Sequence, residues 1–186
     1  MVKANVNLFK YNPSSKIVKT NVNLLKYLVL DLDHTLIYCK KIRTKKGVRR
    51  QFILRPQLFK FLNTLKEYYI LNIFTGATEE YGNKVFKKIK GKTYSFFKRL
   101  CSNGLENGEK KMDKILKDET RIILIDDNKK YIDNKKNAII IKPFFGNKND
   151  NVLPKLEKIL IDIHDRFIDV TKGIKVYKND IKNINK

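Results

Sequence analysis

Three short apolar runs, each ended by carboxylate or hydroxyl residues, most constrain how this chain can fold. The runs are residues 27–30, 69–74 and 121–125. Continuous apolar runs of this length are typical of strands that are buried on both faces of a parallel sheet. The polar residues that end them are Asp31, Asp33, Thr75, Asp126 and Asp127. Because ligands bind at the carboxyl ends of the strands in open α/β sheets, we expect these side chains to converge on one site.

Segments with helical periodicity separate these runs. Apolar residues recur at helical spacing in residues 58–65, from about residue 78 to 89, and in 152–167, where we expect the last amphipathic helix. Residues 138–141 form a fourth apolar run. This alternation predicts an α/β fold: a Rossmann-like parallel sheet with helices on both faces.

A small β-hairpin flap is predicted after the first strand. Residues 36–42 and 48–54 form two strand-like segments joined at Lys45, Lys46 and Gly47, where the glycine supplies the turn conformation. The basic run at residues 40–50 is either a flap that faces the substrate or a solvated hairpin.

The domain organisation is simple, because 186 residues suit one domain with an ordinary core. We expect an N-terminal arm over residues 1–26, with a short strand at 18–24, then the α/β domain over 27–170 and a polar, basic tail over 171–186. Cys39 and Cys101 are too few for a disulfide framework, so we interpret both as reduced thiols. The sequence shows neither a secretory core nor an apolar run of membrane-spanning length, which predicts an intracellular protein, cytoplasmic or nuclear, without membrane insertion.

The charge of the chain is strongly positive. Its 41 Lys and Arg residues against 19 Asp and Glu residues give a net charge of +22. Such a field attracts anionic partners, for example nucleic acid or a phosphorylated peptide. Lys, Asn and Ile are also abundant throughout, as AT-rich codons would produce. Composition alone therefore leaves two explanations open, a functional basic surface and compositional drift.

A hard cation is the simplest means of holding the carboxylates at the strand ends together. Asp31 directly follows a buried strand, where a carboxylate without a partner is costly. Mg²⁺ prefers oxygen ligands, namely one or two carboxylates, several waters and the phosphate of a substrate. In such a site one carboxylate can attack phosphorus and form an acyl phosphate, while a second protonates the leaving alcohol. These residues predict Mg²⁺-dependent hydrolysis of a phosphomonoester.

The order of the motifs resembles that of the haloacid dehalogenase superfamily of phosphatases. The D-x-D-x-T signature of that superfamily matches residues 31–35, DLDHT. The similarity extends through residues 54–56, 73–77, 110–127 and 139–144. Within the superfamily, the chain is most similar to the small phosphatases that act on the carboxy-terminal domain of RNA polymerase II and to their nuclear-envelope relatives. The resemblance implies a protein Ser/Thr phosphatase with a phosphoprotein or phosphopeptide as substrate.

The resemblance also implies roles for the acidic residues. Asp31 is expected to be the nucleophile and a metal ligand. Asp33 is expected to act as the general acid and base and to give the metal its backbone carbonyl. Asp127 is expected to bind the metal directly or through water, and Asp126 to support it or to pair with the phosphate-binding lysine.

The remaining roles belong to hydroxyl and ammonium groups. The resemblance implies that Thr75 and Lys110 bind the phosphoryl group, with Lys111 as the alternative lysine, and that Thr35 orients the nucleophile loop. His34 stands where this branch usually has Glu, and its side chain is expected to point away from phosphorus.

Two other functions are compatible with the same residues. A nucleic-acid end phosphatase or nucleotidase would use the same chemistry, and the charge of +22 suits a polyanion. A non-catalytic phospho-binding or scaffold module is the second alternative, although the presence of both Asp31 and Asp33 argues against it. The physiological substrate and the oligomeric state are not specified by the sequence.

Overall fold

The structure is a computed structural model that describes residues 25–45, 47–90 and 94–185. Residues 1–24 of the expected N-terminal arm, with the strand expected at 18–24, lie outside the described residues. The strands are β1 (Lys26–Leu30), β2 (Ile37–Thr44), β3 (Gly47–Leu54), β4 (Tyr69–Phe74), β5 (Arg99–Leu100), β6 (Ile122–Asp126) and β7 (Ala138–Ile140). The α-helices are α1 (Leu58–Leu65), α2 (Glu79–Ile89), α3 (Val152–Arg166), α4 (Val170–Val176) and α5 (Lys178–Ile184). Short 3₁₀ turns occur at Ser102–Gly104, Met112–Lys114, Glu119–Arg121, Lys129–Tyr131 and Lys135–Asn137.

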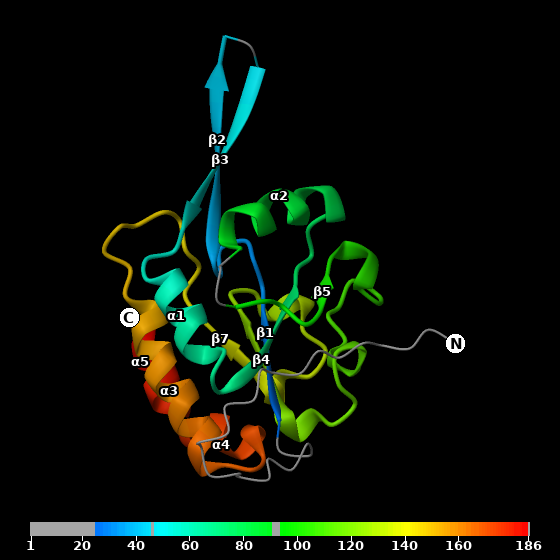
Figure 1. Ribbon diagram of the computed structural model, residues 1–186, viewed down its shortest axis with the longest axis vertical. Helices are drawn as coiled ribbons and strands as arrows, with labels where there is room; N and C mark the ends of the chain where they lie inside the picture. Colours follow the sequence, from blue (N-terminus) through cyan, green and yellow to red (C-terminus); the bar gives the residue numbers. More distant parts are fainter. Residues whose placement is uncertain (1–24, 46, 91–93, 186) are drawn as a thin grey trace, which may run out of the picture.

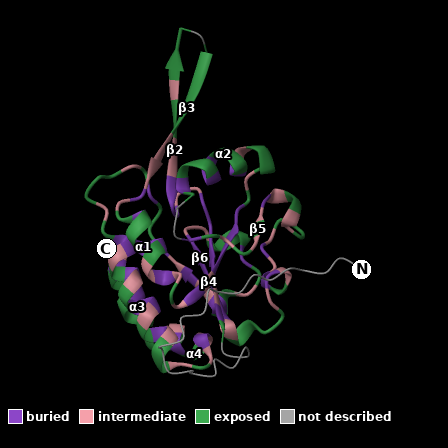
Figure 2. Cartoon of the chain, in the orientation of Figure 1, coloured by how far each residue is buried: buried purple, intermediate pink, exposed green. Residues whose placement is uncertain are grey.

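The central element is a five-stranded sheet with the strand order β5-β4-β1-β6-β7. Every neighbouring pair in it is parallel, and the middle strand β1 lies between β4 and β6, with Leu28 beside Leu71 and Ile123. The predicted parallel α/β sheet is confirmed (Figure 1), and its three central strands β1, β4 and β6 are almost entirely buried (Figure 2).

The two faces of this sheet are covered differently. Leu28 and Leu30 share one hydrophobic cluster with residues of α1, α2, α3 and α5. Val29 faces the other way and packs with Met112, Ile115 and Ile132, which come from 3₁₀ turns and loops. The helices predicted on both faces are thus α-helices on one face and short 3₁₀ turns on the other. The segments that cover this second face are rich in Asn, Gly, Asp and Lys, residues that favour turns over a continuous helix.

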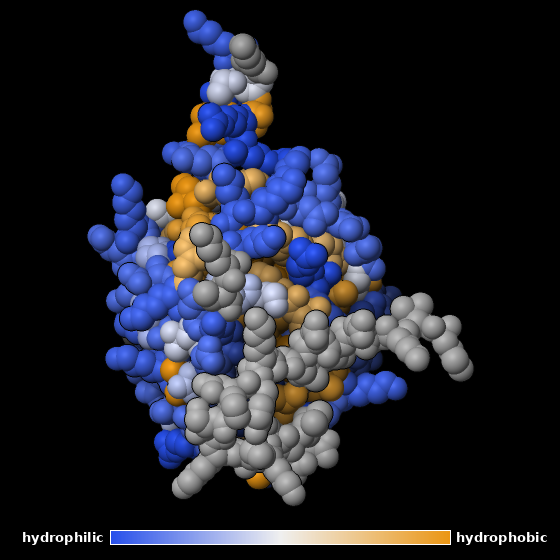
Figure 3. All heavy atoms as spheres, viewed as in Figure 1, coloured by the Kyte–Doolittle hydropathy of each residue, from blue (hydrophilic) through white to orange (hydrophobic). Residues whose placement is uncertain are grey.

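The predicted hairpin flap is formed by β2 and β3, which pair in antiparallel register and project from the body beside α2 (Figure 1). Gly47 closes the turn with φ 113°, a conformation that favours glycine. A two-stranded sheet is marginally stable by itself, so its base needs packing. Ile37 is buried there, and the Phe52 ring lies edge-on to Tyr81 at 5.5 Å. Figure 3 shows hydrophobic residues at this base and hydrophilic ones over much of the visible surface.

The C-terminal segment differs from the polar, basic tail expected over residues 171–186. It folds into α4 and α5, so α3 is not the last helix. Ile181 and Ile184 are buried against α3, and Gly173 lets α4 approach so closely that a Cβ atom there would lie 2.9 Å from Ile163 Cγ2. The few isoleucines of this segment stand among many lysines, which hides their spacing. Among the described residues, no helix is both long and apolar enough to cross a membrane.

Candidate active site

Most of the predicted site residues lie around one cavity of about 290 Å³ at the carboxyl end of β1, β4 and β6. Those that line it are Asp31, Asp33, Thr75, Lys110, Asp126 and Asp127. Thr35 does not line the cavity; it is fully buried behind it and donates to Asp127 Oδ1 at 3.4 Å. The parallel sheet thus brings Thr35 next to Asp127, although the two are 92 positions apart in the sequence.

Lys110 connects two of the carboxylates. Its Nζ lies 2.6 Å from Asp31 Oδ1 and 2.7 Å from Asp126 Oδ2, and the side chain is almost fully buried. The backbone is held as well, because Lys110 N donates to Tyr131 O at 2.7 Å. Lys111, the alternative lysine, instead pairs with Asp133 at 2.7 Å. The structure thus places Lys110, and not Lys111, in the cavity.

The other acidic residues of the cluster are also fixed. Asp31 N donates to Ile125 O at 3.0 Å, which continues the β1–β6 pairing to the first residue after the strand. Asp126 Oδ1 accepts from Asn128 N at 2.8 Å, so this carboxylate is held from both sides. Carboxylate oxygens of Asp31, Asp126 and Asp127 all lie within 4.8 Å of one another.

The electrostatics of the cluster show more negative charge than the lysine balances. Burial raises the pKa of the Asp31 carboxyl to about 7, and the Lys110 ammonium opposes this rise. Burial and the neighbouring Asp126 both raise the pKa of Asp127. Burial by itself lowers the pKa of Lys110, but Asp31 and Asp126 together raise it. The cluster has three carboxylates and one ammonium group. The carboxylate oxygens are the ligands that a hard divalent cation such as Mg²⁺ prefers, so the cluster fits such an ion.

Asp33 lies apart from this cluster and has a partner of its own. The Tyr81 hydroxyl, near the start of α2, donates to Asp33 Oδ1. Burial raises the pKa of the Asp33 carboxyl, and the bond from Tyr81 opposes this shift. Helical periodicity identifies Tyr81 as an inward-facing residue but gives no sign of its contact with Asp33, 48 positions away.

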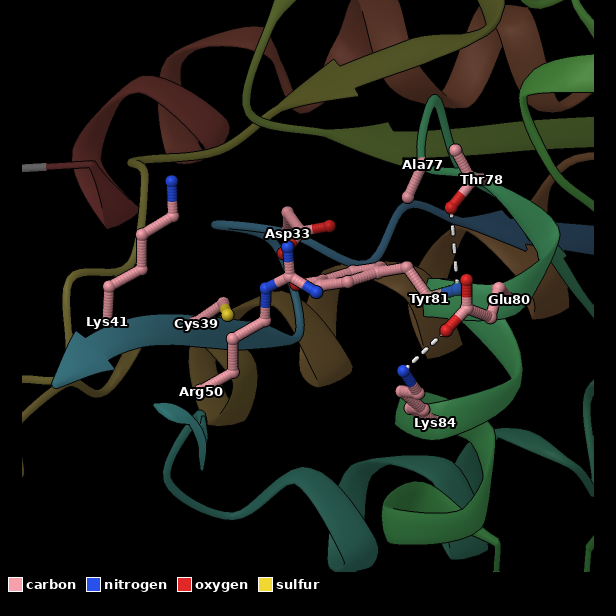
Figure 4. A pocket seen from close by; sticks show the side chains of 9 residues that line it. All are labelled: Asp33, Cys39, Lys41, Arg50, Ala77, Thr78, Glu80, Tyr81 and Lys84. Carbon is pink, nitrogen blue, oxygen red and sulfur yellow. Dashed lines mark hydrogen bonds and ion pairs between the residues drawn. The ribbon is translucent and has the colours of Figure 1, made fainter. Parts of the chain in front are cut away.

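A second cavity of about 400 Å³ opens beside Asp33, between the hairpin and α2 (Figure 4). Cys39, Lys41 and Arg50 line it from the two hairpin strands. The Arg50 guanidinium lies 5.9 Å from the centre of the Tyr81 ring. Part of the basic run at residues 40–50 therefore faces a cavity that adjoins the first one, since Asp33 and Ala77 line both.

Thr75 and His34 also line the first cavity. Thr75 follows β4, is buried, and accepts a hydrogen bond from Ala77 N on Oγ1 at 3.2 Å. His34 has φ 60°, and its Nδ1 lies 3.1 Å from Phe144 O. The His34 ring also lies 4.9 Å from the Phe145 ring. His34 thus connects the loop after β1 to the loop after β7.

Arg55, a buried arginine, holds the loop after β1 in place through hydrogen bonds. Arg55 donates to Thr35 O at 3.0 Å, to Lys142 O at 2.8 Å, and to both carboxylate oxygens of Asp150 at 2.8 and 2.9 Å. Its guanidinium joins the loop after β1 to the loop before α3. The resemblance includes Arg55 within residues 54–56 but gives it no role, and no local sequence pattern marks Asp150.

Comparisons with known proteins agree with this geometry. The family model described as NLI interacting factor-like phosphatase matches residues 26–171. CTD nuclear envelope phosphatase 1 of Xenopus tropicalis is 28% identical over 163 residues, which cover 72% of this chain and 67% of that protein. The mitochondrial import inner membrane translocase subunit TIM50 of Gibberella zeae is 31% identical over 157 residues, or 81% of this chain and 29% of that protein. The structure of Fcp1, an essential RNA polymerase II CTD phosphatase, superposes with a TM-score of 0.66 at 18% identity, covering 88% of this chain and 70% of that one.

Proposed function

The chain belongs to the NLI interacting factor-like phosphatase family, and from this premise we propose that it removes phosphate from Ser or Thr of a phosphoprotein through a phospho-aspartate on Asp31. The observation that carries the proposal is the position of Lys110 Nζ, 2.6 Å from Asp31 Oδ1 in a buried cavity. An ammonium group at this point can bind phosphoryl oxygens while the adjacent carboxylate attacks phosphorus.

In the first half of the reaction, an Asp31 carboxylate oxygen forms a bond to phosphorus and the ester oxygen leaves. The departing alkoxide takes a proton from Asp33, whose raised pKa suits it to carry one. Thr75 and Lys110 hold the phosphoryl oxygens, since both line the cavity. Tyr81 keeps the Asp33 carboxyl aimed at the leaving group through its hydrogen bond.

In the second half, Asp33 takes a proton from water and the resulting hydroxide attacks the phosphorus of the acyl phosphate. The bond between phosphorus and Asp31 breaks, so inorganic phosphate leaves and the carboxylate is restored. Asp31, Asp127 and the backbone carbonyl of Asp33 would hold Mg²⁺, with Asp126 engaged by Lys110. When bound, this ion supplies positive charge that offsets the repulsion between carboxylate and phosphate.

A phosphopeptide suits the surroundings of the site. The cavity beside Asp33 is lined by Lys41 and Arg50, which can receive acidic groups on the residues that flank a phosphoserine. The Xenopus relative and the structural neighbour are both named as phosphatases, and the latter acts on a protein, RNA polymerase II. A nuclear or cytoplasmic place of action is part of the same proposal.

The alternatives are less well supported. The TIM50 relative carries the name of a translocase subunit, so the fold alone does not make a chain catalytic. Here, however, both aspartates and Lys110 are present and converge. A nucleic-acid end phosphatase would need a surface for bases, and the lining of the cavity beside Asp33 offers Tyr81 as its one aromatic ring.

The deciding experiment compares three substrates with Mg²⁺ present: a phosphoserine peptide with acidic flanking residues, a 3′-phosphorylated oligonucleotide and a generic aryl phosphate. We expect kcat/KM for the peptide to exceed that for the oligonucleotide by at least about tenfold, a difference of roughly 1.4 kcal/mol in transition-state binding. A preference for the oligonucleotide of that size would reverse the substrate assignment. Absence of turnover for all three would favour the binding module.

A further inference from the structure

A groove that shares no lining residue with the candidate active site lies between the edge strand β7 and the helices α4 and α5. It has a volume of about 850 Å³. Apolar side chains line it from three elements: Ala138 and Ile140 of β7, Ile174 of α4 and Ile181 of α5. Ala138, Ile140 and Ile174 are only partly buried, so the groove exposes apolar surface.

Asn185 fixes the two walls of the groove to each other. Its Nδ2 donates to Ile140 O at 3.0 Å, and its Oδ1 accepts from Lys142 N at 2.6 Å. The side-chain amide therefore pairs with the outer edge of β7 as the backbone of a further strand would. Since α5 is tied to the sheet in this way, the groove is formed before any partner arrives.

Seven exposed lysines surround the apolar lining. One bank, on the 3₁₀ turns before β7, consists of Lys129, Lys135 and Lys136. The opposite bank, on α4 and α5, consists of Lys172, Lys175, Lys178 and Lys182. The lining contains no carboxylate, and within the described part of the chain these ammonium groups form no ion pair. Like charges so close together repel one another, and an anionic occupant would relieve that repulsion.

We propose that this groove is a docking site for an acidic amphipathic segment of a partner protein. Apolar side chains of that segment would lie on the floor, and its carboxylates would meet the two lysine banks. This is the helix-in-groove mode of peptide recognition, with charge complementarity setting the choice of partner.

Charge and shape favour this occupant over others. A second copy of the chain carries a net charge of +22 and would be repelled. Among the described residues, the groove lining has no aromatic ring on which a nucleic-acid base could stack, and phosphates would leave the apolar floor unused. A flat lipid surface would touch the lysine rims without filling the hollow between them.

The test uses fluorescence anisotropy with the full chain and a labelled helical peptide of about 14 residues, roughly 21 Å long. The peptide carries Leu along one stripe and Glu elsewhere, and a second peptide has every Leu replaced by Ser. The groove variant combines Lys172→Glu, Lys175→Glu and Lys182→Glu. Its matched control, with the same change in net charge, combines Lys60→Glu, Lys88→Glu and Lys155→Glu, all exposed lysines outside the groove. Ile174→Ser tests the floor, and circular dichroism verifies folding.

We expect the groove variant to weaken binding of the Leu peptide at least about tenfold and the control variant to weaken it less than about threefold. The Ser peptide and Ile174→Ser should each reduce affinity by about fivefold or more, because both remove apolar contact. Turnover of an aryl phosphate should not change in any variant. Equal losses in the two triple variants would overturn the proposal in favour of general charge attraction. Binding to phosphatidylserine vesicles that depends on the three groove lysines, without binding of the Leu peptide, would instead assign the surface to lipid.

Discussion

Arg55 and Asp150, 95 positions apart, form a bidentate ion pair with N–O distances of 2.8 and 2.9 Å, in which the arginine is fully buried and the aspartate largely buried. The same guanidinium holds the carbonyl of Thr35 beneath the nucleophile loop. Arg55→Lys keeps the charge but loses the planar fork that reaches these acceptors. We expect it to lower the free energy of unfolding by about 3 kcal/mol, because a buried carboxylate loses its partner.

Urea unfolding provides the measurement for this variant. Lys84→Gln is the control, since it removes an exposed pair with Glu80 and should cost less than about 0.5 kcal/mol. If Arg55→Lys lowers the free energy of unfolding by less than about 1 kcal/mol, the Arg55–Asp150 ion pair is not important for stability.

The nucleophile is tested by Asp31→Asn, which is nearly isosteric but cannot form an acyl phosphate. We expect kcat to fall by at least about a thousandfold while the fold stays intact. Fluorine NMR should show a beryllium fluoride adduct on the unsubstituted chain and none on the variant. Asp113→Asn, at an exposed position, should retain both adduct and activity. An adduct that persists in Asp31→Asn would place the nucleophile elsewhere.

The metal is tested by activity and by stability. A strong chelator should abolish turnover, and Mg²⁺ should restore it, because phosphate must approach three crowded carboxylates. Mg²⁺ at ten times its Kd should also stabilise the fold by about 1.4 kcal/mol. Asp127→Asn should reduce this stabilisation while leaving the metal-free fold at least as stable, since it removes one of the repelling charges. Full turnover in chelator would refute the proposed role of the ion.

The role of the cavity beside Asp33 in peptide binding is tested by combining Lys41→Gln and Arg50→Gln. These two residues pair with each other across β2 and β3. For an acidic phosphopeptide, we expect KM to rise about tenfold with little change in kcat, the pattern of lost uniform binding. KM for a small aryl phosphate should stay the same, because it does not reach the hairpin. Lys60→Gln with Lys88→Gln serves as the charge-matched control, because both lysines are exposed and neither lines this cavity. An equal rise in KM in the control would indicate general attraction by the charge of the chain.

The sheet and its polar edge were predictable because both depend on local sequence. Continuous apolar runs identify β1, β4 and β6, and the first residues after each run necessarily lie at the same edge of a parallel sheet. The resemblance favoured Lys110 as the phosphate-binding lysine but left Lys111 as the alternative. The two are adjacent in sequence, and only tertiary packing turns one into the cavity and the other toward Asp133.

The contacts that could not be predicted join residues without any shared periodicity. Tyr81 meets Asp33, and Arg55 meets Asp150, because α2 and the loop before α3 return to the same edge of the sheet. The helices α4 and α5 were missed for a different reason. Each has only two buried residues, Val170 and Gly173 in α4 and Ile181 and Ile184 in α5, and the lysines between them lower the apolar signal of the segment.

The position of β6 beside β1 also affects how the protein folds during synthesis. Asp31 lies 79 residues before Lys110, and β1 pairs with β6 although a long stretch of sequence separates the two strands. Such distant pairings come at a high entropic cost of loop closure and are slow to form. During synthesis, the nucleophile loop leaves the ribosome well before its lysine exists. On the proposed mechanism, a partly made chain carries the aspartates without the lysine that would hold phosphate, and recovery of turnover after dilution from urea would mark the pairing of β6 with β1.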